Sequence, residues 1–183
     1  MYQTAMAKET VLHYTGHVAW AIAKLLLLVF VLPLLPAVAS GMPVPAVLAL
    51  IISTLVIEYG AAPVGLGFGL HPVYVLLALT SIGLGVTLFL FDILDTIGEH
   101  SERVKRFLTR SAERGRSSPL FAKYGVCGLV PCVMTLGFYV CPPVACVFGW
   151  KRDHSILMIM AGYVGISIAT ILLTMGIFDL LLG

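Results

Sequence analysis

Glu58 is the side chain whose place in the sequence most clearly predicts chemistry. It closes an apolar run that begins at Pro43, and it precedes a segment, residues 59–72, that holds four glycines and two prolines. A carboxylate inside a membrane predicts a functional role, because loss of water disfavours its charged form. We therefore expect Glu58 to carry a proton. A shallower position, in which it only reaches the membrane–water interface, is the alternative.

Two more titratable residues lie at the ends of apolar segments. His71 precedes Pro72, and we expect it to share a proton with Glu58, unless it is a structural histidine in a tight turn. Arg152 follows an uncharged stretch. In the ordinary interpretation Arg152 fixes the orientation of the chain in the membrane. In the functional interpretation it contacts a phosphate from the cytoplasmic side.

Asp92, Asp95 and the cysteines are weaker candidates. The two aspartates lie one helical turn apart and suit a cation site or a proton relay. A solvated helix end, or pairing with arginines of the following basic segment, is the interpretation that we favour. The four cysteines lie within one uncharged stretch and lack the C-x2-C spacing of zinc and iron–sulfur sites, so we interpret them as small packing residues.

Two breaks in the apolar pattern offer backbone chemistry. Half-helices that begin after Pro63 and after Pro142 and Pro143 direct free N–H groups toward an anionic substrate group or a carboxylate. Broken backbone is tolerated at membrane depth only where protein buries it or where it lines a wet cavity. Tight turns and close packing are the alternative explanation of these glycines and prolines. The predicted substrate- and proton-binding residues are Glu58, Gly60, Pro63, Gly67, His71, Pro72, Gly137, Pro142, Pro143 and Arg152.

The elements that must position these residues are apolar. Of 183 residues, 60% are hydrophobic and 11% charged, against about 25% charged in soluble proteins. Four stretches contain no charge, and each exceeds the roughly 18 residues that mark a transmembrane candidate. The composition excludes a soluble globular domain and predicts a polytopic membrane protein. The uncharged stretches are 25–57, 60–91, 124–150 and 155–178.

Familiar catalytic and nucleotide-binding motifs do not occur. The chain has no serine elbow, phosphate loop, H-E-x-x-H or Rossmann glycine fingerprint, so we expect no enzyme, no metal and no cofactor. Seven of the eleven basic residues lie between Arg103 and Lys123. We interpret this cluster as a determinant of membrane topology that also contacts anionic lipid headgroups, and we expect no nucleic-acid partner.

The predicted fold is an all-α polytopic membrane protein of one membrane domain. Residues 25–39 also resemble the apolar core and A-x-A end of a signal peptide, but we favour a first transmembrane helix. Two inverted re-entrant helical hairpins are each followed by a transmembrane helix. The expected order is an N-terminal surface segment 1–17, a transmembrane helix 18–40, a re-entrant hairpin 43–80, a helix 81–98, a basic cytoplasmic linker 99–123, a second hairpin 124–150 and a helix 154–178.

Charge placement favours hairpins over additional spans. If 43–58, 73–91 and 124–150 all crossed the membrane, some basic residues would be exported whichever side the N-terminus occupied. If 43–80 and 124–150 each return to their own side, every basic residue is cytoplasmic. The 27 residues from 124 to 150 suffice for two half-helices that reach about mid-bilayer.

An internal similarity also favours two hairpins. Residues 66–72, Leu-Gly-Phe-Gly-Leu-His-Pro, align with residues 136–142, Leu-Gly-Phe-Tyr-Val-Cys-Pro, at an offset of 70. With one crossing between them, the copies would open to opposite faces, as in the inverted-topology repeats of transporters. Chance similarity in a chain rich in leucine and glycine is the alternative.

Several stretches resemble the prokaryotic small multidrug export protein family over residues 50–178. They are Glu58-Tyr-Gly-Ala-Ala-Pro63, Gly67-Phe-Gly-Leu-His-Pro72 and Ser118-Pro-Leu-Phe-Ala-Lys-Tyr-Gly125. That family is distantly similar to the DedA/VTT membrane proteins, which share paired re-entrant hairpins and include transporters of polyprenyl-phosphate lipid carriers and lipid scramblases. Glu58 resembles the acidic residue that DedA proteins place before a glycine and a proline. DedA proteins also place arginines within the second hairpin, whereas here Arg152 follows it.

The leading functional hypothesis is a proton-coupled or passive translocase of a phospholipid or polyprenyl-phosphate carrier, in a prokaryotic plasma (inner) membrane with a cytoplasmic N-terminus. The alternatives are a small-molecule (multidrug)/proton antiporter and a non-transporting membrane organising protein. The expected partners are membrane lipids, protons and a small amphiphilic substrate, and a homo-oligomer is compatible with all three hypotheses.

Overall fold

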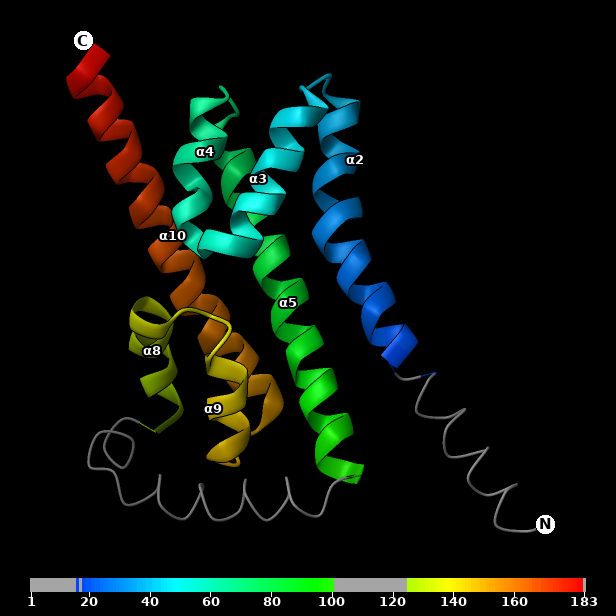
Figure 1. The fold of residues 1–183 in the computed structure, drawn as a ribbon. Coiled ribbons are helices and arrows are strands. Elements are labelled where there is room, and N and C mark those ends of the chain that lie inside the picture. Colours follow the sequence, from blue (N-terminus) through cyan, green and yellow to red (C-terminus); the bar gives the residue numbers. More distant parts are fainter. Residues whose placement is uncertain (1–15, 17, 101–124, 183) are drawn as a thin grey trace.

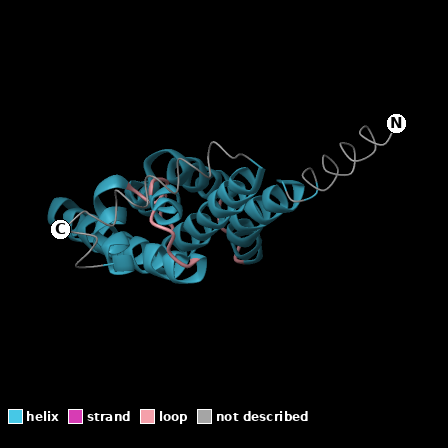
Figure 2. Cartoon of the chain, turned by 90° about the horizontal axis from the view of Figure 1, so that it is seen from below, coloured by secondary structure: helices cyan, strands magenta, loops and turns pink. Residues whose placement is uncertain are grey.

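The computed structural model describes residue 16 and residues 18–100 and 125–182, and the other residues are drawn as a thin trace in Figure 1. The predicted surface segment 1–17 and the linker 99–123 therefore lie almost entirely outside the described residues. Within the described ranges every regular element is helical and no strand is present (Figure 2).

Four segments of the described chain are long and apolar enough, by length and composition, to cross a membrane, which supports the prediction of a polytopic membrane protein. They are Val18–Ala39, Val44–Gly67, Pro72–Thr96 and Arg152–Gly176. The first contains a π-helical turn, Leu27–Val31, followed by α2, Leu32–Ala39. The α-helices that follow it in the described chain are α3 (Val44–Ile57), α4 (Ala62–Gly67), α5 (Pro72–His100), α8 (Leu129–Leu136), α9 (Cys141–Val147) and α10 (Arg152–Leu182).

The segment Val44–Gly67 does not continue straight. α3 runs from one end of the molecule to its middle, and α4 returns toward the same end (Figure 1). A Cβ placed on Gly65 of α4 would lie 3.1 Å from Cδ1 of Leu50 in α3. In a continuous helix these two residues would be about 22 Å apart. The chain therefore folds back at the turn Glu58–Ala61, and α3 and α4 form the first hairpin.

α8 and α9 form a second hairpin in the opposite half of the molecule (Figure 1). α5 runs from the end that holds the first hairpin to the end that holds the second, and α10 runs back. α5 begins at Pro72, whereas we expected the helix after the first hairpin to begin at residue 81. Proline at the first helical position costs no hydrogen bond and has the required φ, so the helix begins there.

The two halves repeat at an offset of 80 residues. Gly69 and Gly149 both have positive φ, 75° and 65°. The turns that they form are closed by equivalent bonds, from the Leu70 amide to the Gly65 carbonyl at 3.1 Å and from the Trp150 amide to the Ala145 carbonyl at 3.2 Å. The same offset pairs Pro-Val at 63–64 with Pro-Val at 143–144, and Phe-Gly at 68–69 with Phe-Gly at 148–149.

The predicted offset of 70 is therefore wrong as a structural register. Residues 136–142 include the turn between α8 and α9, whereas residues 66–72 end α4 and lead into α5. Leucine and glycine are so frequent in this chain that a short match arises without structural equivalence. The positive-φ glycine after each second half-helix is the more reliable marker, because few other residues adopt that conformation.

The core lies where α5 and α10 cross between the hairpins. Tyr163 of α10 is fully buried, and a Cβ on Gly83 of α5 would lie 2.7 Å from its ring. Gly83 and Tyr163 are themselves 80 residues apart. The ring of Tyr163 also meets the ring of Phe138 edge to face, with 4.9 Å between centroids. The crossing thus brings the second hairpin's turn against α10.

Candidate functional site

The turns of the two hairpins meet, and Glu58 makes the contact between them. Its Oε2 accepts a hydrogen bond from the backbone N–H of Phe138 at 3.2 Å, and the N–H of Tyr139 also donates to the carboxylate. The turn between α8 and α9 therefore supplies N–H donors, as we expected of the second break in the apolar pattern. The carboxylate that accepts these hydrogen bonds belongs to the first hairpin. Hydrogen bonds to a charged acceptor are about twice as strong as neutral ones.

Gly137 makes room for this contact. Its φ is 82°, a conformation that residues with a Cβ rarely adopt. A Cβ built there would overlap the carboxylate oxygens of Glu58. Glycine is therefore required at this position by its backbone conformation and by the approach of Glu58.

The backbone of Glu58 is itself unusual. Among the described residues it is the one non-glycine residue with positive φ, 58°, and its ψ is −130°. Such conformations cost of the order of 1–3 kcal/mol and persist where surrounding contacts hold them. Its N–H still bonds to the Thr54 carbonyl and ends α3. The strained residue thus terminates the helix and directs its side chain toward the second hairpin.

Two tyrosines connect the hairpins reciprocally. The Tyr139 hydroxyl donates to the Leu55 carbonyl at 2.6 Å, and the Tyr59 hydroxyl donates to the Met134 carbonyl at 3.3 Å. Both carbonyls lie in the last turn of a helix, where no intrahelical N–H reaches them. Tyr59 and Tyr139 are 80 residues apart, so each turn supplies the equivalent hydroxyl to the other hairpin. Neither tyrosine was among the site residues that we predicted from the sequence. Their separation of 80 residues, the offset of the repeat, is the sequence signal that could have paired them.

Glu58 has no basic partner among the described residues. The ion pairs of the described chain lie elsewhere: Arg152 binds Asp92 and, at 2.8 Å, Asp95, while Lys24 binds Asp92 at 3.1 Å. We expected the two aspartates to form a solvated helix end or to pair with arginines of the linker, and those arginines lie outside the described residues. Within the described chain, Arg152 and Lys24 are the partners of the aspartates. The two guanidinium nitrogens of Arg152 that form ion pairs bind the carboxylates of α5. The structure therefore does not place Arg152 at the hairpin turns.

His71 is not brought to Glu58. It lies in the exposed turn between α4 and α5, and its Nδ1 accepts a hydrogen bond from the Val73 N–H at 3.3 Å. Glu58 lies before α4 and His71 after it, so the length of that helix separates them. The structure therefore shows no direct contact between His71 and Glu58 through which they could share a proton.

The remaining predicted residues shape the turns. Gly60 lies in the turn Glu58–Ala61, where a Cβ would approach a methyl group of Ile57 to 2.8 Å. Pro63 lies in the first turn of α4 and Gly67 ends that helix. Pro142 and Pro143 lie in the first turn of α9, and Pro142 is buried. Proline in a first turn is compatible with a helix, so these residues start the returning half-helices.

The cysteines are all free thiols. Cys141 and Cys132 are buried, Cys146 is partly buried and Cys127 is exposed. The Cys141 thiol donates to the Gly137 carbonyl at 3.3 Å, which places it directly behind the turn that holds Glu58. Within the ranges that the structure describes, no group of three or more His, Cys, Asp or Glu residues is arranged to bind a metal ion.

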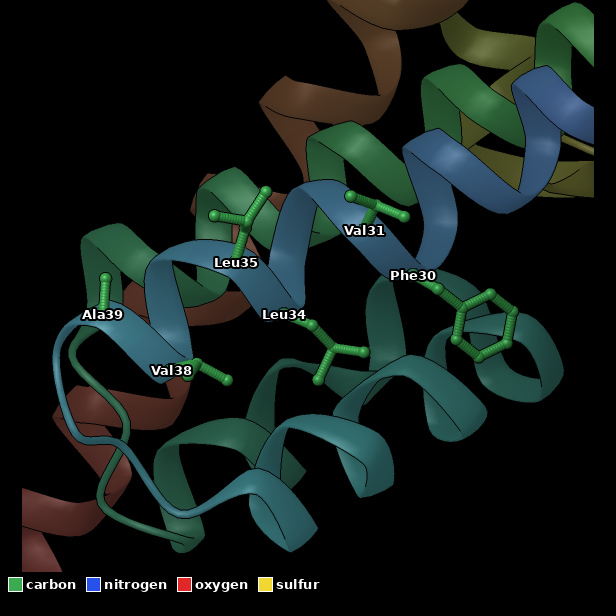
Figure 3. Close-up of a pocket in the computed structure, with 6 residues that line it drawn as sticks. All are labelled: Phe30, Val31, Leu34, Leu35, Val38 and Ala39. Atoms are coloured by element: carbon green, nitrogen blue, oxygen red, sulfur yellow. The ribbon is translucent and has the colours of Figure 1, made fainter.

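An apolar groove lies away from the turns, on the helix Val18–Ala39. Figure 3 shows Phe30 and Leu34 projecting from one side of the helix and Val31 and Leu35 from another. The groove is lined by these residues together with Val38 and Ala39. These apolar side chains offer surface for hydrocarbon but no group for chemistry. The meeting of the two turns is therefore the better candidate site.

Comparison with known proteins identifies one family. A family model described as "Putative small multi-drug export protein" matches residues 58–171, more than half of the chain. The matched range begins at Glu58 and contains both turns, α5 and most of α10. No curated protein and no solved structure matches the chain.

Proposed function

The chain belongs to the small multi-drug export protein family, and from that premise we propose that it is a proton-coupled membrane transporter whose substrate site lies between the two hairpin turns. α3–α4 and α8–α9 are re-entrant hairpins that enter from opposite membrane faces, and α5 and α10 cross the membrane. The protein lies in a prokaryotic plasma membrane, with its N-terminus and basic linker in the cytoplasm, as the positive-inside rule favours.

The observation that carries this proposal is the contact between Glu58 and the second hairpin. The carboxylate is held by backbone N–H groups and has no basic partner among the described residues. Adding a proton removes the charge that those N–H groups stabilise, so the bond between the turns weakens. The hairpins then separate and admit a substrate, and loss of the proton closes the contact again.

The first substrate candidate is a phospholipid or a polyprenyl-phosphate carrier. When protonated Glu58 leaves the N–H groups of Phe138 and Tyr139, those donors are available to a phosphate oxygen. The groove on Val18–Ala39 gives the acyl or prenyl chain an apolar surface beside the hairpins. A negatively charged headgroup would be repelled by ionised Glu58, which makes proton uptake a condition of binding.

The second candidate is exchange of protons for a lipophilic organic cation. The specific observation in its favour is an acid beside aromatic rings that has no basic partner within the described ranges. Phe138 stacks on Tyr139 at 4.4 Å and meets Tyr163 at 4.9 Å. Aromatic faces attract cations. In this mechanism the proton and the cation compete for Glu58. The family description, which names multi-drug export, agrees with such a substrate.

Reconstitution into liposomes tests both candidates. Two assays are run on the same preparation: exchange of a fluorescent phospholipid between leaflets, and uptake of a fluorescent lipophilic cation driven by a pH gradient. We expect Glu58→Gln to abolish whichever activity the wild type shows. Asp153→Asn is the matched control, because Asp153 is an exposed carboxylate at the start of α10, remote from the turns.

The outcomes separate the hypotheses. Lipid exchange above that of empty vesicles selects the lipid carrier, and cation uptake selects the antiporter. Wild-type protein that does neither, although it is folded and correctly inserted, favours the membrane organising protein. Activity that survives in Glu58→Gln at the wild-type rate would refute the assigned role of Glu58.

A further inference from the structure

The ion pairs of the described chain gather at one end of the molecule, where α5 ends and α10 begins beside the second hairpin (Figure 1). Asp92 of α5 lies between two cations. Lys24 of the first helix binds its Oδ2 at 3.1 Å, and Arg152 of α10 binds its Oδ1. Arg152 also binds Asp95, one turn further along α5, at 2.8 Å. These four side chains, which we call the ionic cluster, join the first helix, α5 and α10.

The position of Arg152 is coupled to that of the second hairpin. The turn after α9 is closed by backbone bonds from the Gly149 amide to the Cys146 carbonyl at 3.1 Å and from the Trp150 amide to the Ala145 carbonyl at 3.2 Å. Arg152 follows two residues after Trp150. α9 itself packs against α5. The ion pairs of Arg152 therefore fasten to α5 the end of α9 that is remote from the turn binding Glu58.

The repeat has no such fastening at the other end of the molecule. At the 80-residue offset the counterparts of Arg152, Asp92 and Asp95 are Pro72, Leu172 and Met175. None of these three side chains can form an ion pair, and the two on α10 are exposed. The two ends of a repeated architecture are thus held by different contacts.

The exposure of the ionic cluster allows the pairs of Arg152 to break and re-form. The side chain of Arg152 is 38% exposed and that of Asp95 is 50% exposed, so water solvates both charges when they separate. Asp92 is less exposed, but Lys24 remains bound to its other oxygen, so its charge keeps a partner. Partly exposed pairs contribute little to stability, whereas leaving a buried charge unpaired is costly.

We propose that the ionic cluster is a latch, in which Arg152 holds the end of α9 against α5 and keeps the path from that side of the protein to Glu58 closed. Release of Arg152 lets α9 move away from α5 about the turn that binds Glu58. The proposal rests on the proposed function, because it supplies the step by which a site between the two turns opens to the side that we assign to the cytoplasm.

The test measures how fast Cys146 reacts with a charged thiol reagent in mixed micelles, with each cysteine read separately by mass spectrometry. Cys146 of α9 is partly buried and packs against the core, so movement of α9 uncovers it. The full chain carries Cys127→Ser, because that thiol is exposed. In low salt we expect Arg152→Gln, and the double variant Asp92→Asn with Asp95→Asn, to accelerate the reaction at least about fivefold, which corresponds to about 1 kcal/mol.

The cluster supplies its own matched control. Lys24 binds the same carboxylate as Arg152 and its side chain is equally exposed, but Lys24→Gln leaves Arg152 bound to α5. We therefore expect the wild-type rate in Lys24→Gln. Arg152→Gln and the double variant change the net charge in opposite directions, so a shared effect identifies the broken bonds as its cause. High salt should raise the wild-type rate and leave that of Arg152→Gln unchanged.

A wild-type rate at Cys146 in Arg152→Gln and in the double variant would overturn the latch. Acceleration in Lys24→Gln would also overturn it, because the effect would then not depend on Arg152. Equal acceleration at Cys132, which is buried in α8, would mean that the variants unfold and would overturn it too. Accelerated reaction of Cys146 alone, combined with transport that Glu58→Gln leaves unchanged, would keep the latch and reject the proposed function. A wild-type rate combined with transport lost in Glu58→Gln would do the reverse.

Discussion

Replacing Gly137 by alanine tests whether the turns are held together by Glu58. The added Cβ would occupy the space of the Glu58 carboxylate and would also require alanine to adopt a φ of 82°. The ψ of Gly137 is 168°, so its backbone lies in a region that is essentially confined to glycine, and such a conformation costs about 1–3 kcal/mol. Loss of a hydrogen bond to a charged group costs about 1.5–3 kcal/mol. We therefore expect Gly137→Ala to lower the free energy of unfolding by about 2.5–6 kcal/mol.

Gly149→Ala separates the two contributions. Gly149 has a φ of 65°, but a Cβ there meets no atom within 4 Å. It should therefore cost only the backbone term, about 1–2 kcal/mol. A double-mutant cycle adds a second control. In a Glu58→Ala background no carboxylate stands in the way, so the cost of Gly137→Ala should fall to its own backbone cost of about 1–3 kcal/mol, giving a coupling energy of about 1.5–3 kcal/mol.

The assay is equilibrium unfolding in mixed micelles followed by tryptophan fluorescence, with all variants purified under one condition. Equal losses of stability in Gly137→Ala and Gly149→Ala would refute the reasoning. So would a coupling energy near zero between positions 58 and 137, since the contact that we describe would then contribute nothing to the folded state.

Three other predictions concern the same unfolding measurement. Tyr139→Phe removes a 2.6 Å bond and should cost about 1 kcal/mol, more than Tyr59→Phe, whose bond is 3.3 Å; the reverse order would contradict the geometry. Arg152→Gln breaks two partly exposed ion pairs and should cost about 1 kcal/mol at low ionic strength and less in high salt; a loss independent of salt would rule out an ionic origin. Gly83→Ala should cost about 1–3 kcal/mol, because its Cβ would lie 2.7 Å from the Tyr163 ring. A Cβ on Gly165 meets no atom within 4 Å, so Gly165→Ala should stabilise α10 by about 0.5–1 kcal/mol. Equal effects of the two substitutions would contradict the close crossing of α5 and α10.

The sequence was sufficient to predict the membrane class, and it directed attention to Glu58, which lies at the contact between the two turns. Long uncharged runs have one physical meaning, and a single acid between them is costly enough to require a purpose. The partner of Glu58 was not predictable in the same way. The N–H of Phe138 lies 80 residues away, and no periodicity of the chain specifies which atoms of two separate hairpins meet.

The register of the repeat shows a second limit of sequence reasoning. Shared leucine, glycine and phenylalanine suggested an offset of 70, whereas the folded chain pairs Gly69 with Gly149 and Tyr59 with Tyr139. Side-chain identity is a weak guide in a chain of so few residue types. Backbone conformation distinguishes the glycines, and it becomes visible only when the turns are closed by their hydrogen bonds.

His71 illustrates why proximity in sequence is a poor guide beyond a break. Thirteen positions separate it from Glu58, and a compact loop would have brought the two side chains together. The segment between them instead forms a short helix that directs the chain back to the surface. The path of the backbone decides which groups the histidine can reach.

The repeated architecture carries its acid on one side only, because the counterpart of Glu58 at the 80-residue offset is Phe138. The repeat thus places a single carboxylate at the meeting of the two turns, and the proton-coupled mechanism that we propose would move one proton per chain through it. Trading one proton for one monovalent cation moves no net charge across the bilayer. Such an exchange would respond to the pH difference and be indifferent to membrane voltage, whereas one proton moving together with a doubly charged phosphate would be electrogenic.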